Sequence, residues 1–249
     1  MTRRRVIGGL VLVLLVLALA GCVPNPDQMK PIDRTDPGFW NGYFVIPLID
    51  ILDATARALG SYGLAILVVT VGLRLLIIPL TLKQMKSSKA MQALQPEMTK
   101  LREKYKNNQQ KLQEETMKLF QKHNVNPLAG CLPILVQMPI LIAFYQSIMH
   151  NTPLFEADFL WLQLGEADPY HILPVLAAVT TYLQSVMMGM SDNPQAKAFL
   201  IIMPIMIFVL SFSFPSALAL YWVYGNLFTM IQYYFIGDKF KAKREGVTR

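Results

Sequence analysis

Long apolar runs alternate with polar segments along the chain. Five of these runs are candidates to cross a bilayer as helices, at residues 61–84, 126–149, 171–190, 198–214 and 217–236. The fourth gives only about 25 Å of helix for a hydrocarbon core of about 30 Å, so it requires a locally thinner bilayer or polar contacts at its ends. The chain as a whole is 53% hydrophobic and only 16% charged, a balance typical of membrane proteins. The pattern therefore predicts an all-α integral membrane protein built as a bundle of five transmembrane helices.

Two further segments show helical patterns but are too polar to cross. In residues 85–125, apolar residues such as Leu94, Met98 and Leu101 recur at helical spacing among many lysines, and "KNNQQK" supplies a central turn. Residues 22–60 begin with a Pro- and Asp-rich linker and continue into a mixed apolar and charged stretch. We expect a helical hairpin over 85–125 and, at the end of 22–60, a helix that lies in the membrane interface. A plain loop into the first span is the alternative for the second segment.

The distribution of charge fixes the orientation of these elements. The hairpin 85–125 and the tail 237–249 are the most basic segments, whereas the loop 150–170 has four acidic residues and no Lys or Arg. Basic loops stay in the cytoplasm, so the hairpin and the tail are predicted inside, and residues 22–60 and the loop 150–170 outside. This topology accounts for the net charge of +7, and we expect no nucleic-acid binding.

Residues 1–22 have the basic start, apolar core and small-residue end of a secretory signal. The end, Leu19-Ala20-Gly21-Cys22, resembles the lipobox of bacterial lipoproteins, in which the cysteine receives a diacylglyceryl group and becomes the new N-terminus. We predict removal of residues 1–21 and lipidation of Cys22 on the outer face, with an uncleaved anchor helix as the alternative. The only other cysteine is Cys131, so neither a disulfide framework nor a cysteine metal site is expected.

Arg74 lies inside the first predicted span, in "VTVGLRLLIIPL", residues 69–80. Inserting an arginine at the middle of a membrane helix costs about 2.5–3.5 kcal/mol on translocon scales. The five predicted spans contain no Asp or Glu, so no carboxylate of the bundle can balance this charge. Two interpretations remain open: Arg74 caps backbone carbonyls at a helix break, or it lies in a hydrated cavity within the bundle.

Side-chain amides and hydroxyls within the spans are the candidate lining of such a cavity. Each alone is ordinary interhelical hydrogen bonding, but together with an arginine that lacks a carboxylate they favour a wet groove. They include Gln137, Gln146, Gln184, Asn226, Gln232, Thr70, Thr180, Thr181 and Ser185. The sequence has no HExxH, GxSxG, glycine-rich phosphate loop or clustered Cys and His ligands. We therefore expect no enzyme activity, no cofactor and no metal.

Three stretches together resemble the YidC/Oxa/Alb family of membrane protein insertases. They are "GLRLLIIPLTLKQMKSSKAMQALQPEMTKLREKY", "NPLAGCLPILVQMPILIAFY" and "FPSALALYWVYGNLFTMIQ", and they cover most of residues 60–236. The lipobox makes the chain similar to the Gram-positive, lipoprotein type of the family. The resemblance implies a five-helix core with a hydrophilic groove open to the cytoplasm and the lipid, and no nucleotide requirement.

The resemblance also implies roles for individual residues and partners. Arg74 matches the groove arginine that receives acidic residues from the short external tail of an arriving client protein. Tyr221, Trp222, Tyr182 and Gln184 match client-contacting positions, although aromatic packing or an interfacial belt also explains the aromatic residues. The implied partners are nascent membrane proteins with short acidic external tails, the lipid bilayer and the Sec translocon, beside which such insertases also act. The short tail after residue 237 argues against the ribosome binding of long-tailed relatives.

Two other functions stay open at this point. An ion- or proton-coupled transporter is the main alternative, but transporters of that kind normally use intramembrane carboxylates, which the five spans lack. A lipoprotein that scaffolds other membrane proteins would leave Arg74 without a role.

Overall fold

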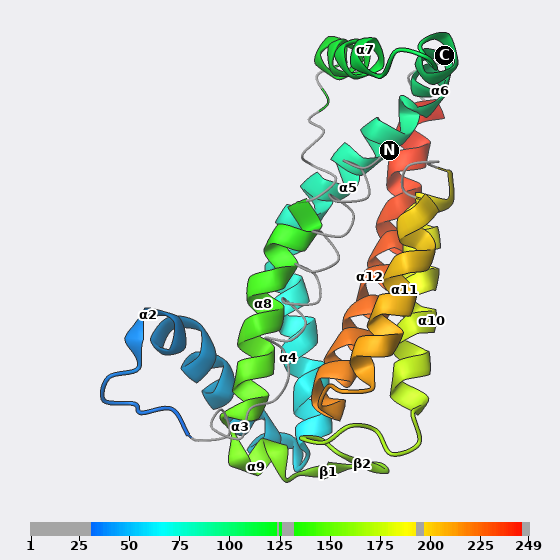
Figure 1. The fold of residues 1–249 in the computed structure, drawn as a ribbon. Coiled ribbons are helices and arrows are strands. Elements are labelled where there is room, and N and C mark those ends of the chain that lie inside the picture. The colour runs from blue at the N-terminus through cyan, green and yellow to red at the C-terminus, as the bar shows by residue number, and fades with distance from the viewer. Residues whose placement is uncertain (1–30, 124, 126–131, 193–196, 246–249) are drawn as a thin grey trace.

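The computed structural model describes residues 31–123, 125, 132–192 and 197–245 (Figure 1). This part of the chain is mostly helical, which confirms the predicted fold class at that level. Its strands, β1 (Asp158–Phe159) and β2 (Leu162–Gln163), form one short antiparallel ribbon. The helices are α2 (Gly38–Trp40), the π-helix η2 (Asn41–Val45), α3 (Ile46–Leu59), α4 (Tyr62–Leu76), α5 (Ile78–Ala93), α6 (Gln95–Lys104), α7 (Gln109–Lys122), α8 (Leu132–Met149), α9 (Thr152–Phe155), α10 (Ile172–Met187), the 3-10 helix η4 (Met190–Asp192), α11 (Lys197–Ser211) and α12 (Ser216–Glu245). The predicted signal sequence, Cys22 and Cys131 lie outside the described residues.

The first apolar segment, 61–84, is bent rather than straight. Helix α4 ends at Leu76 and α5 begins at Ile78, with an angle of 63° between them. Pro79 accounts for the break, because it has no N–H for the carbonyl of Leu75 and its ring clashes with the preceding turn. Within the described ranges, no single helix is both long and apolar enough to cross a membrane, whereas the bent pair α4–α5 meets that standard by length and composition.

Helices α10, α11 and α12 pack together along one side of the molecule, and α4 packs against α12 (Figure 1). Helix α8 packs against α3, α5 and α12. The main core joins these groups through buried side chains such as Ile66 of α4, Phe144 of α8 and Leu220 of α12. The meeting of α4, α8 and α12 positions the candidate site described below.

Helices α6 and α7, residues 95–122, form a helical hairpin at one end of the molecule, beyond α5 (Figure 1). Residues 85–93, which were predicted as part of the hairpin segment, instead continue α5. Leu94, Met98, Leu119 and Phe120 form the hairpin's own small buried cluster. Asn108 caps α7, since its side-chain oxygen accepts a hydrogen bond of 3.0 Å from the Lys111 amide. The hairpin thus has a core separate from that of the helices below it.

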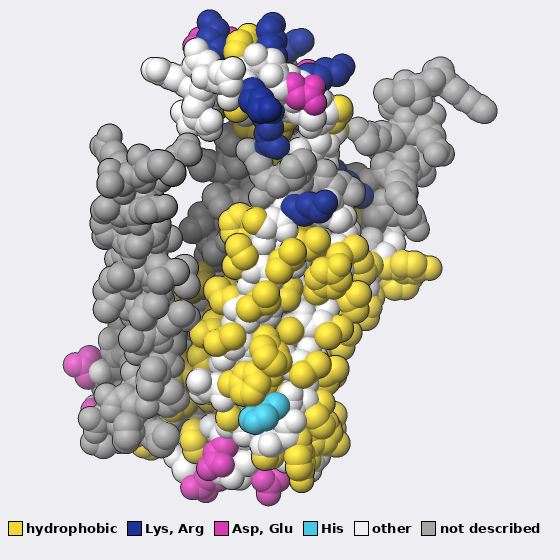
Figure 2. Space-filling model, turned by 45° about the vertical axis from the view of Figure 1, so that its right-hand side comes forward, with side chains coloured by type: hydrophobic (Ala, Val, Ile, Leu, Met, Phe, Trp, Pro, Cys, Tyr) yellow, Lys and Arg dark blue, Asp and Glu magenta, His cyan; other side chains and the backbone are white. Residues whose placement is uncertain are grey.

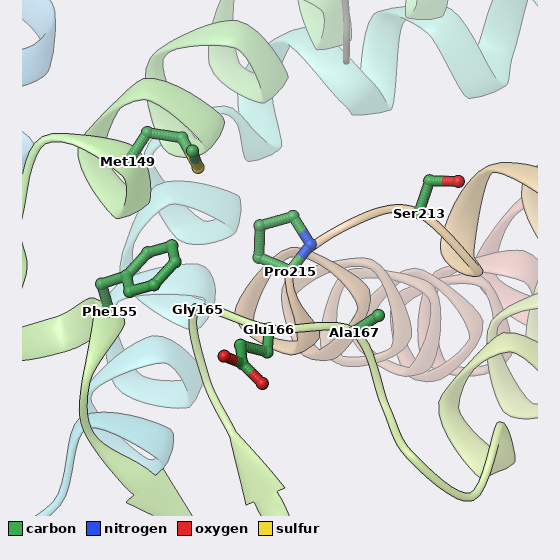
Figure 3. A pocket seen from close by; sticks show the side chains of 7 residues that line it. All are labelled: Met149, Phe155, Gly165, Glu166, Ala167, Ser213 and Pro215. Carbon is green, nitrogen blue, oxygen red and sulfur yellow. The ribbon is translucent and has the colours of Figure 1, made fainter. Parts of the chain in front are cut away.

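The opposite end of the molecule is closed by the segment between α8 and α10. The carbonyls of Glu166 and Leu164 accept hydrogen bonds of 2.7 and 2.9 Å from the backbone amides of Ser216 and Ala217. They satisfy two of the free N–H groups at the start of α12. Beside this junction lies a cavity of about 390 Å³. Figure 3 shows its lining, which consists of Met149, Phe155, Gly165, Glu166, Ala167, Ser213 and Pro215.

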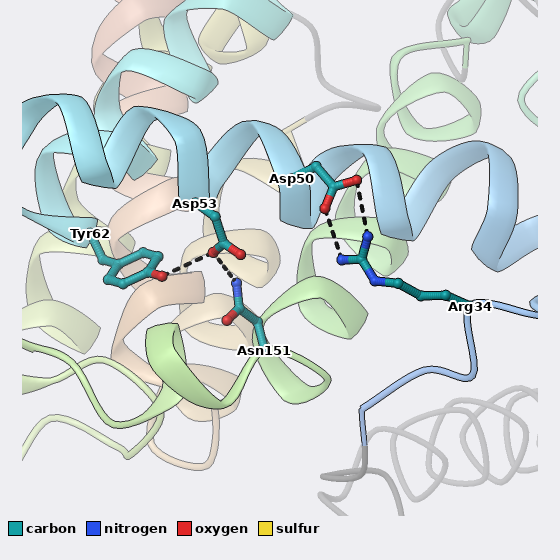
Figure 4. A network of polar contacts seen from close by, with 5 residues as sticks. All are labelled: Arg34, Asp50, Asp53, Tyr62 and Asn151. Carbon is teal, nitrogen blue, oxygen red and sulfur yellow. Dashed lines mark hydrogen bonds and ion pairs between the residues drawn. The ribbon is translucent and has the colours of Figure 1, made fainter.

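Polar contacts hold the segment before α4 in place, within itself and against the rest of the structure (Figure 4). Asp53 of α3 accepts hydrogen bonds from the Tyr62 hydroxyl at 2.9 Å and from the Asn151 amide at 2.7 Å. Arg34 forms an exposed ion pair with Asp50 at 2.8 Å, and the hydrogen bond to this carboxylate raises the pKa of Arg34. Helix α3 is therefore tied to both α4 and the end of α8, with Leu52 and Ala56 buried beneath it.

Candidate functional site

Arg74 lies in the last turn of α4, directly before the bend. The C-terminal end of a helix carries a partial negative charge, which is favourable for a cation. The break therefore explains part of what stabilises the guanidinium at this position. Among the described residues, however, Arg74 makes neither an ion pair nor a hydrogen bond to a carbonyl. The simple carbonyl-capping interpretation is thus not what the geometry shows.

The guanidinium of Arg74 lies against α12. A Cβ atom built on Gly225 would stand 2.5 Å from one terminal nitrogen of Arg74, and 3.3 Å from both Cζ and Nε. Tyr221, one turn before Gly225 on α12, also lies near the Arg74 guanidinium. The positive charge is therefore held between the end of α4 and the face of α12 that carries Tyr221 and Gly225.

Tyr221 is fixed by two neighbours on α8. Its hydroxyl accepts a hydrogen bond of 2.7 Å from the side-chain amide of Gln137. Its ring stacks on Phe144, with 4.4 Å between the ring centroids, and only 2% of the residue is exposed. The structure thus brings Arg74, Gln137 and Tyr221, three of the residues predicted from the sequence, into one cluster.

Trp222 follows Tyr221 in the chain but faces a different helix, because successive residues on a helix point about 100° apart. Its indole nitrogen donates to the Thr181 hydroxyl of α10 at 3.0 Å. Asn226, one turn later, donates to the hydroxyls of Thr180 and Thr181 at 3.0 and 2.9 Å. These contacts join α12 to α10, so the two adjacent aromatic residues belong to neighbouring faces of α12.

The predicted residues of α10 lie apart from the Arg74 cluster. Tyr182 is 45% exposed on the outer surface of the helix. Gln184 is half-buried, and its amide contacts the sulfur of Met188 on the same helix at 3.7 Å. Neither side chain has a described contact with Arg74 or Tyr221.

Gln146 lies apart from both the Arg74 cluster and the predicted residues of α10. Its side-chain oxygen accepts a hydrogen bond of 2.5 Å from the indole nitrogen of Trp40 in α2. Gln137 and Gln146 are nine residues apart on α8, so they lie about 13 Å apart along the helix axis. Gln146 therefore holds the segment before α3 against α8, while Gln137 contacts Tyr221 of the Arg74 cluster.

Gly225 is the site residue that the sequence did not indicate. A glycine in an apolar helix gives no chemical signal, and its importance depends on an arginine in a distant helix. In contrast, the large cavity near Glu166 in Figure 3 contains none of the Arg74 cluster.

Comparisons with known proteins agree with the predicted resemblance. The sequence profile of the 60Kd inner membrane protein family matches residues 54–244. Membrane protein insertase YidC 1 of Halalkalibacterium halodurans is 52% identical over 240 residues, which cover 94% of this chain and 92% of that protein. Membrane protein insertase MisCA of Bacillus subtilis is 52% identical over 242 residues, with the same shares covered.

A solved structure is also similar. A crystal structure of an active YidC insertase, with its first transmembrane domain resolved, superposes with a TM-score of 0.67 at 27% identity. The match covers 80% of this chain and 47% of the crystallised one, so the chain spans about half the length of that protein. The family profile, the similar sequences and the similar fold all indicate the same family. The chain belongs to the 60Kd inner membrane protein family.

Proposed function

We propose that this protein is a membrane protein insertase of the bacterial plasma membrane, which helps arriving proteins enter the bilayer and fold there. Relatives that carry this name are 52% identical over most of the chain. The observation that supports a mechanism is the Arg74 cluster. There a permanent cation meets Gly225 and Tyr221, and no carboxylate pairs with it in the described part of the chain.

In this proposal the five apolar segments cross the membrane with the hairpin α6–α7 in the cytoplasm. Figure 2 shows a broad hydrophobic band on one face, with the Lys and Arg side chains of this view toward one end, together with some Asp and Glu, and only Asp and Glu among the charged side chains at the other end. Exposed residues of α10 and α11 such as Val175, Val179, Ile201 and Ile205 contribute apolar surface. The basic end corresponds to the cytoplasmic side. The acidic end, with the segment between α8 and α10, then lies outside, as does the predicted lipid on Cys22.

Arg74 supplies a positive charge that pairs with the carboxylates of a client's acidic tail while the tail crosses the membrane. A carboxylate about 4 Å from the guanidinium gains on the order of 4 kcal/mol at an effective dielectric constant of about 20, before desolvation. This gain offsets part of the cost of bringing a polar tail halfway across the membrane. The membrane potential, negative inside, then favours outward movement of the tail by about 2.3 kcal/mol per charge per 100 mV.

The apolar part of the client leaves sideways into lipid. Tyr182 and Leu183 of α10 and Leu227 and Ile231 of α12 are exposed, so these helices offer an apolar surface along which a client segment can slide. Burial of its apolar groups in lipid drives the step. The mechanism needs no covalent chemistry and no nucleotide, and it operates alone or beside the Sec translocon.

Reconstitution tests this function directly. The purified chain is placed in lipid vesicles, and a single-span client with an acidic external tail is synthesised outside them. We expect vesicles with the protein to protect the client's tail from added protease several times more than empty vesicles do. Equal protection in both vesicles, with the protein folded and correctly oriented, would contradict the function. Dissipation of an ion gradient by the protein would instead favour the transporter.

A further inference from the structure

Gly225 occupies a position where a glycine is not required by the backbone. It lies within the continuous helix α12, and its φ is not in the left-handed region. Alanine favours a helix interior more than glycine, because glycine loses more conformational freedom on folding. The reason for the glycine must therefore lie in the space around it.

That space is filled by Arg74. The three nearest atoms to a Cβ at Gly225 all belong to this one side chain, and the nearest is the terminal nitrogen at 2.5 Å. Ordinary contact begins at 3.4 Å, so a methyl group would push the guanidinium back by about 1 Å. The arginine end is flexible and can move, whereas the helix backbone cannot easily do so.

Tyr221 also lies near the guanidinium, on the same face of α12 as Gly225. The stacking on Phe144 and the hydrogen bond from Gln137 hold this ring in place. The hydroxyl of Thr229 also donates to the Gly225 carbonyl at 2.8 Å. The bare backbone at Gly225 and the fixed ring of Tyr221 thus lie one helical turn apart on the face of α12 that Arg74 approaches.

We infer that Gly225 is a positioning residue for Arg74: its missing Cβ lets the guanidinium rest against α12, beside Tyr221, where the client's acidic tail meets it. The inference rests on the proposed function. Gly225 does not contact the client. It sets the depth and direction of the charge, and a small displacement of a positioned charged group has a large effect on the step it assists.

The test compares two Gly→Ala variants in two helices. Gly72 of α4 is the matched control, because a Cβ there would meet nothing within 4 Å. In the reconstituted system, we expect Gly225→Ala to slow insertion of an acidic-tail client by about fivefold or more and to leave a neutral-tail client unchanged. Its thermal stability should equal or exceed that of the parent protein. Gly72→Ala should insert both clients normally.

Two results would overturn the inference: normal insertion of the acidic-tail client by Gly225→Ala, or an equal loss for both clients. Combining Gly225→Ala with Arg74→Ala shows whether Gly225 acts through Arg74 or independently of it. If Gly225 acts through Arg74, the double variant is no slower than Arg74→Ala alone, whereas additive losses would contradict this route. Normal insertion by Arg74→Ala would refute the proposed role of Arg74, and equal tail protection in vesicles with and without the protein would refute the insertase function. Both results are distinct from a failure confined to Gly225→Ala.

Discussion

Replacing Arg74 by alanine is expected to slow insertion of a client with an acidic external tail by at least about tenfold, which requires a loss of only 1.4 kcal/mol. The charge interaction proposed above is larger than this before desolvation is subtracted. Arg74→Lys should keep much of the activity, because a lysine preserves the charge, although it loses the planar donor geometry. The rate of tail protection in vesicles measures both variants.

Protein level is the necessary control for this result. Removing a charge from a membrane helix lowers the cost of inserting that helix, so Arg74→Ala should accumulate as well as the parent protein. A variant that is abundant and folded, yet inserts the acidic-tail client at the normal rate, would show that Arg74 does not assist the tail. Loss of activity in Arg74→Lys equal to that in Arg74→Ala would indicate that geometry matters more than charge.

The second large effect concerns Asp168, at the end of the molecule opposite the hairpin. Only 2% of this residue is exposed. Its carboxylate accepts hydrogen bonds from the indole nitrogen of Trp161 at 3.1 Å and from the backbone amides of Tyr170 and Leu173 at 3.0 and 2.6 Å. The N-cap residue of α10 is His171, but Asp168 satisfies the Leu173 amide in the first turn of α10 and joins this helix to the loop before it.

Asp168→Ala is expected to destabilise the protein by about 2–4 kcal/mol, because it leaves these donors without their acceptor. The stability of Asp168→Asn should lie between those of the parent protein and Asp168→Ala, since the amide oxygen of asparagine retains part of the accepting capacity. Thermal unfolding in detergent provides the measurement. Glu156→Ala is the matched control, because Glu156 is an exposed carboxylate in the same segment and should have little effect. Equal midpoints for Asp168→Ala and Glu156→Ala would contradict this role of Asp168.

Much of this architecture could be predicted because it depends on local pattern and on composition. The helical class follows from long apolar runs. The functional importance of Arg74 was predicted because the sequence alone shows that those runs contain no Asp or Glu to pair with it. The turn between α6 and α7 lies within the polar "KNNQQK" stretch, where Asn108 provides the cap.

The site itself could be predicted only in part, because it depends on which helix faces which. Gln137 and Gln146 look equivalent in the sequence, but one contacts Tyr221 of α12 and the other contacts Trp40. Tyr221 and Trp222 were grouped together, yet adjacent residues of a helix point in different directions. Asp168 counted only as an external negative charge, since its burial arises from tertiary packing.

The central claim is that Arg74 interacts with the client's acidic tail, and a double-mutant cycle tests it most directly. Insertion rates are measured for the parent protein and Arg74→Ala, each with an acidic-tail client and with the same client neutralised by Asp→Asn and Glu→Gln changes. The account predicts that neutralising the tail removes most of the effect of Arg74→Ala, with a coupling energy above about 1 kcal/mol. Effects that add to within about 0.5 kcal/mol would show that Arg74 and the tail act independently, and would contradict the account.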